Sequence, residues 1–75
     1  MRYAVVLEKG KRNYSAYVPD LPGCVATGKT VQATLSAIRE AIEFHIAGLV
    51  EDRQPVPDPT TLVDYVEVDI PTAMT

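Results

Sequence analysis

Residues 14–30 read YSAYVPDLPGCVATGKT, and this stretch contains two strand patterns, a rigid turn and a helix start. Its first five residues include two tyrosines and a valine, which are typical of strands. Pro19 ends this strand, because proline lacks the backbone N–H that a sheet ladder needs. Pro22 and Gly23 suit the centre of a type II turn, where proline presets φ and glycine accepts a positive φ. The residues that follow are predicted to return as an antiparallel strand.

The flanking sequence extends this pattern in both directions. Gly10 and Asn13 favour a hairpin between the first two strands, and Thr30 is a good helix N-cap. The helix is expected to bury one stripe of apolar side chains at helical spacing. The members of this stripe are Val31, Leu35, Ile38, Ile42, Ile46 and Leu49. The sequence therefore predicts strands at about residues 2–8, 13–18, 24–28 and 64–70, and a helix at about residues 30–52.

This β-β-β-α-β order predicts an α+β fold with one helix packed on one face of a sheet. Crossover connections in sheets are right-handed, so the last strand is expected to lie parallel to the first. The first strand is apolar on both sides, which favours a central position. The second sheet face is then left open, and an exposed apolar face usually marks a partner surface.

The composition indicates a single domain over residues 1–75 with a net charge of −3. A chain of this length buries only about 60% of its unfolded surface, so we expect a homo-oligomer, a dimer or tetramer, or a hetero-partner. The negative charge argues against general nucleic-acid binding, which needs a basic face, and makes direct DNA binding doubtful. No apolar run reaches the length of about 20 residues that spans a membrane, so a cytoplasmic location is the default expectation.

The sequence predicts no catalytic, cofactor or metal site. One cysteine and one histidine, Cys24 and His45, are too few for a typical zinc site. The letters from Gly23 to Thr30 match a phosphate-binding loop, but the residues inside this match are themselves predicted to form a strand. A packing role is the favoured interpretation for Cys24, and a packing or capping role is favoured for His45. An enzymatic role for His45 is the weakest hypothesis.

The chain resembles the HicB-like antitoxins over residues 3–70. The resemblance rests on residues 14–30, on AIREAIEFH at residues 37–45, on Gly48-Leu49 and Glu51-Asp52, and on the alternating prolines from Pro55 onward. It implies a truncated ribonuclease-H-like sheet without nuclease activity. It also implies a type II antitoxin that covers a small basic mRNA-cleaving toxin, HicA. Many members carry a further C-terminal DNA-binding domain, whereas this sequence stops at Thr75, so the resemblance is to a short form.

Two hypotheses of different classes stay open at this point. The first is an antitoxin that inhibits its toxin by protein–protein contact, and the second is an orphan oligomer with a ligand-binding or structural role. For Phe44, packing on the flank of the core and contact with another subunit are both open. The predicted partner-binding residues come from the turn, the helix flank and the last strand. They are Tyr17, Asp20, Leu21, Pro22, Phe44, Tyr65, Glu67 and Asp69.

Overall fold

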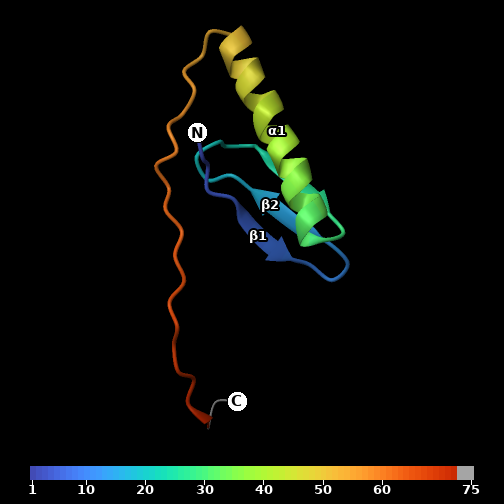
Figure 1. Ribbon diagram of the computed structural model, residues 1–75, viewed down its shortest axis with the longest axis vertical. Helices are drawn as coiled ribbons and strands as arrows, with labels where there is room; N and C mark the ends of the chain where they lie inside the picture. Colours follow the sequence, from blue (N-terminus) through green and yellow to red (C-terminus); the bar gives the residue numbers. More distant parts are fainter. Residues whose placement is uncertain (73–75) are drawn as a thin grey trace.

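The chain folds as three antiparallel strands followed by one long helix, as seen in a computed structural model that describes residues 1–72 (Figure 1). The elements are β1 (Val6–Lys9), β2 (Tyr14–Tyr17), β3 (Val25–Gly28) and α1 (Val31–Glu51). The sheet order is β1-β2-β3, and α1 packs on one face of β2 and β3. The predicted α+β class and the order of the first four elements are confirmed. The predicted end of the domain, residues 73–75, lies outside the described residues.

Two consecutive β-turns connect β2 to β3. Leu21 N–H donates to the Val18 carbonyl at 3.1 Å, and Cys24 N–H donates to the Leu21 carbonyl at 3.0 Å. Gly23 has a φ of +83°, as the third position of a type II turn requires. The predicted turn geometry at Pro22 and Gly23 is therefore confirmed, and the double turn reverses the chain onto the core.

The helix starts where its cap was predicted. The Thr30 hydroxyl accepts a hydrogen bond from Ala33 N–H at 3.0 Å, which satisfies one of the free N–H groups of the first turn. The buried face differs from the predicted stripe, because Thr34 and Ile38 are its buried centre, whereas Leu35 is 41% exposed. Thr34 can be buried because its hydroxyl donates to the Thr30 carbonyl at 2.7 Å.

The core lies between α1 and the sheet and includes the double turn. Its buried apolar members are Ala16, Val18, Leu21, Cys24 and Ile38. Tyr3 and Val5 pack against this cluster from the N-terminal segment. Burial also raises the pKa of the Cys24 thiol, which disfavours the reactive thiolate. The predicted packing role of Cys24 is confirmed.

The structure departs from the prediction at the end of the chain, since residues 64–70 form no fourth strand. Residues 62–70 are exposed along their whole length and leave the body as an extended segment, which we call the tail (Figure 1). Within residues 1–72, β2 is the central strand and β1 is an edge, so the predicted central position of the first strand is corrected. The physical reason is that the period-2 pattern of the tail favours an extended backbone but specifies no pairing partner.

Candidate protein-interaction surface

The open face of the sheet carries an apolar row that crosses all three strands. Val6 pairs with Tyr17, and Tyr17 pairs with Val25, so the three side chains lie side by side on one face. Ala16 is buried under α1, and successive side chains of a strand point to opposite faces. Tyr17 therefore points away from the helix. Tyr17 is 42% exposed and Val25 is 65% exposed, which leaves this open-face row available to a partner.

A polar row lies next to the open-face row. The residues Glu8, Ser15 and Thr27 are paired across the strands in the same way and are exposed. The open face is thus divided into an apolar half near the double turn and a polar half near the hairpin. Sequence reasoning selected Tyr17 but missed Val6 and Val25. The hairpin register, which places both opposite Tyr17, could have identified them.

The turn residues have different roles from one another. Leu21 is 0% exposed and belongs to the core, so its predicted partner contact is corrected: no surface of this side chain is left for a partner. Pro22, the next residue, is exposed. The turn formers on both sides of Leu21 suggested a surface position, but the double turn folds this leucine inward.

Asp20 anchors the segment that follows α1, residues 52–61, which we call the linker. One carboxylate oxygen accepts a hydrogen bond from Thr61 N–H at 3.0 Å, and the other accepts from the Thr61 hydroxyl at 2.8 Å and the Thr60 hydroxyl at 3.3 Å. The hydrogen bonds from Thr61, first from its N–H and then from its hydroxyl, hold the pKa of Asp20 below its usual value. Asp20 therefore has an internal structural role, which sequence reasoning could not assign.

We expect Asp20→Ala to release the linker while leaving the core intact. The amide of Thr61 should then lose protection in hydrogen exchange, whereas the amides of α1 should keep theirs. Asp58→Ala, which removes an exposed carboxylate from the same linker, is the matched control.

The attachment of the linker should also depend on pH. In the wild type, the hydrogen bonds from Thr61 favour the ionised form of the Asp20 carboxylate, so the contribution of Asp20 to holding the linker is complete above the ordinary Asp pKa of about 3.9. This contribution is lost as the pH falls through the lower pKa that Asp20 has when it is bonded to Thr61. An NMR titration of the Thr61 amide that shows no transition in acid would contradict this role.

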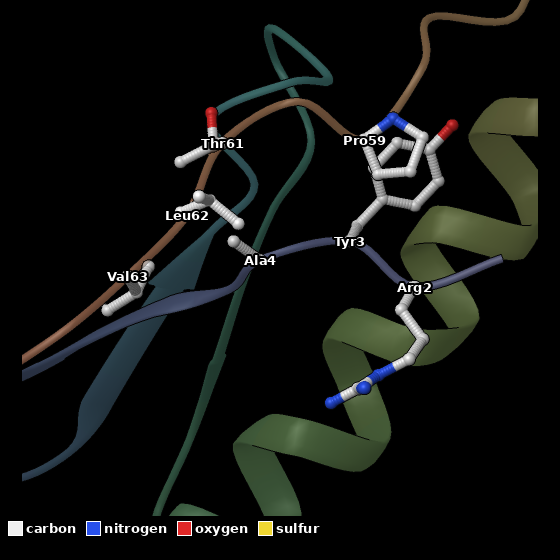
Figure 2. Close-up of a pocket in the computed structure, with 7 residues that line it drawn as sticks. All are labelled: Arg2, Tyr3, Ala4, Pro59, Thr61, Leu62 and Val63. Carbon is white, nitrogen blue, oxygen red and sulfur yellow. The ribbon is translucent and has the colours of Figure 1, made fainter.

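A hollow of about 280 Å³ separates the anchored linker from the N-terminal segment. Figure 2 shows Tyr3 and Pro59 together at one part of this hollow, and Ala4 near Leu62 and Val63. The Tyr3 hydroxyl also donates to the Pro57 carbonyl at 2.5 Å. The linker is thus held at two points, one on each side of Pro59: Pro57 is bonded to Tyr3 of the N-terminal segment, and Thr61 is bonded to Asp20 of the double turn.

The remaining predicted residues are not brought together with Tyr17. Phe44 is 83% exposed on α1, which packs on the sheet face opposite to the open-face row. Packing of Phe44 on the flank of the core is therefore excluded as its main role. Tyr65, Glu67 and Asp69 are exposed on the tail. The predicted set thus falls into three separate surfaces: the open face with the turn, the exposed side of α1, and the tail.

A family model described as "HicB_like antitoxin of bacterial toxin-antitoxin system" matches residues 3–70. The chain belongs to the HicB-like antitoxin family. It is 36% identical over 66 residues to a 14.9 kDa protein of Haemophilus phage HP1 and spans 50% of that relative's length. It is also 40% identical over 67 residues to a UPF0150 protein of Synechocystis, of which it spans 85%. In both cases the match includes 88% of this chain.

A solved structure supports the same family. A chain of the HicA3 and HicB3 toxin–antitoxin complex matches with a TM-score of 0.68 and 29% identity, covering 79% of this chain and 69% of that chain. The HicB-like resemblance found in the sequence is thereby confirmed, together with the α+β fold. Among residues 1–72, no helix is both long and apolar enough to cross a membrane.

Proposed function

We propose that this HicB-like chain is a non-enzymatic antitoxin that binds a HicA-like, mRNA-cleaving toxin by protein–protein contact and inhibits it. The observation that carries the proposal is the similarity, over most of the chain, to a chain from a solved toxin–antitoxin complex. The family match over residues 3–70 supports the same role. The proposal includes a cytoplasmic site of action, because the toxin acts on mRNA.

The open-face row is the surface that fits this function best. It presents an aromatic residue between two β-branched residues on a rigid sheet, and exposed apolar surface of this kind marks protein partners. Tyrosine is enriched among the residues that dominate interface energetics. Glu8 lies on the same face, and the chain carries a net charge of −3. Complementary charge on a basic toxin would speed the encounter and suppress wrong partners.

The test is co-expression with a HicA-like protein encoded beside this chain. We expect co-expression to restore the growth that the toxin alone arrests, and we expect the two proteins to co-purify. Growth arrest that persists, with no complex recovered from a folded chain, would reject the antitoxin role. It would favour the orphan interpretation.

We expect Tyr17→Ala to weaken toxin binding much more than it destabilises the fold. Loss of an aromatic residue at an interface centre costs about 2 kcal/mol or more, or roughly 30-fold in Kd. The free energy of unfolding should change by only about 1 kcal/mol, because 42% of the residue is already exposed to water. Calorimetric titration and thermal unfolding measure the two effects.

Ser15→Ala is the matched control, since Ser15 lies on the same strand and the same face but in the polar row. It should leave both quantities nearly unchanged. A large drop in Tm for Tyr17→Ala with unaltered toxin affinity would instead identify Tyr17 as a core residue.

A further inference from the structure

The tail has the side-chain pattern of a strand, but within residues 1–72 it is paired with no other strand. On one side it carries four apolar residues and one aspartate, and on the other side it is mostly acidic and aromatic. The apolar side consists of Leu62, Val66, Val68 and Ile70, interrupted by Asp64. Each of these apolar residues is among the exposed large hydrophobic residues of the chain. We call these four apolar side chains the tail strip.

The tail is exposed along its whole length, and beyond its first two residues it extends away from the rest of the chain. The radius of gyration is 15.7 Å, whereas a compact domain of this length has about 11 Å. The longest dimension of the chain is 56 Å, and Figure 1 shows that the tail extends well past the hairpin end of the sheet. An unpaired apolar strand in water is unstable as such, because its side chains stay hydrated and its backbone lacks a ladder.

The start of the tail is fixed in place. Thr61 is bonded to Asp20, and Pro57 is bonded to Tyr3, so the chain leaves the body next to the N-terminal segment. The prolines at positions 55, 57 and 59 stiffen the linker and restrict its return to the domain.

The sheet offers a matching acceptor at β1. This strand is an edge and pairs only with β2, so one row of its N–H and C=O groups is free within the described chain. On the helix side, Leu7 is 37% exposed. A hollow of about 340 Å³ lies between the N-terminal residues and α1, and it is lined by Met1, Tyr3, Ile38, Ile42 and Ile46 together with the charged Arg39 and Glu43. An added strand with apolar residues at alternate positions would cover this apolar surface.

We propose that two copies of this chain exchange their tails, so that residues 62–70 of each copy pair along the β1 edge of the other. The tail strip faces the partner's helix side, and Glu67 and Asp69 stay in water. One isologous, two-fold arrangement then pairs the β1 edge of each copy with the tail of the other in a closed dimer. A second copy is the occupant that the geometry favours, because the chain's own tail passes beside residues 2–4 without forming a ladder.

A pair of proline variants tests the exchange. In a strand paired on one side, the N–H groups of alternate residues point into the ladder, and proline removes one such N–H. We expect the wild type to show twice the 8.2 kDa mass of one chain in light scattering at micromolar concentration. One of the two variants Val66→Pro and Glu67→Pro should fall to the mass of one chain, and the other should remain a dimer. Because residues 66 and 67 are exposed, both variants should keep the helical circular dichroism of the wild type.

Every other result overturns the proposal. A wild type with the mass of one chain would mean that the tail pairs within its own chain or waits for a different partner. Dimers that survive in both variants would place the interface elsewhere, and loss of the dimer in both would exclude pairing along a single edge. No toxin is present in this experiment, so its failure leaves the proposed antitoxin function unaffected.

Discussion

Leu21→Ala should destabilise the domain by about 3–5 kcal/mol, the range found for fully buried leucines whose removal leaves a cavity. Leu21 is 0% exposed and belongs to the same cluster as Ala16 and Ile38. The double turn holds its backbone, because its N–H and its carbonyl are both hydrogen-bonded. The site therefore has little freedom to collapse around the missing atoms. A domain of this length has a total stability of only about 4–11 kcal/mol, so much of the margin would be lost.

Chemical denaturation followed by circular dichroism measures this loss. Leu35→Ala is the matched control, because it makes the same chemical change at a helix position that is 41% exposed. It should cost about 1 kcal/mol, in proportion to the smaller apolar area that it returns to water. Equal losses for the two variants, or a Leu21→Ala variant that unfolds like the wild type but no longer binds toxin, would contradict the core assignment.

The sequence predicts those parts of this fold that depend on local backbone chemistry. Pro22 and Gly23 adopt the expected turn because only a few residue types accept those dihedrals. Thr30 caps α1 because its hydroxyl satisfies a free N–H of the first turn. These features need no knowledge of the rest of the chain, so they can be identified from a few neighbouring residues.

The features that were missed depend on contacts between distant parts of the chain. Asp20 is a turn residue by type, and only the structure shows that it is bonded to Thr61, 41 positions away. Leu21 has the neighbours of a surface residue but the packing of a core residue. The tail has the pattern of a strand, yet pattern alone specifies neither an acceptor edge nor whether that edge belongs to the same chain.

The interpretation of Tyr17 depended partly on local sequence and partly on contacts between distant parts of the chain. Alternation along β2 placed it on one face of the sheet, but the role of that face required the register of both neighbouring strands. The structure supplies Val6 and Val25 on either side and so turns a single exposed tyrosine into an apolar row. Candidate contacts on a sheet are better predicted as cross-strand rows than as separate residues.

Gly28→Ala should be strongly destabilising, although Gly28 lies in a regular strand and its φ is not in the left-handed region. A Cβ atom at this position would lie 2.7 Å from both the backbone nitrogen and the hydroxyl oxygen of Thr34, and 3.0 Å from the carbonyl carbon of Ala33. Two of these three atoms are helix backbone and cannot rotate away. The first turn of α1 would have to move off β3, and we expect a loss of about 2–3 kcal/mol, as for other overpacked cores.

Gly48→Ala is the matched comparison, and we expect it to change the free energy of unfolding in the opposite direction. Gly48 lies inside α1, and a Cβ there would meet no atom within 4 Å apart from the neighbouring backbone of the helix itself. Alanine in a helix interior is favoured over glycine by about 0.5–1 kcal/mol, so this variant should be more stable than the wild type. Urea unfolding measures the free energy of unfolding of both variants, which should fall for Gly28→Ala and rise for Gly48→Ala relative to the wild type.

A double-mutant cycle with Thr34→Ala then identifies the atoms responsible for the Gly28 effect. Removing the Thr34 hydroxyl relieves one close contact but leaves the contact with the backbone nitrogen unchanged. Gly28→Ala should therefore remain costly in the Thr34→Ala background. Full recovery of stability in that background would show that the side chain alone limits the approach of β3 to α1. Persistent loss would show that the close packing of strand and helix backbones requires glycine at this position.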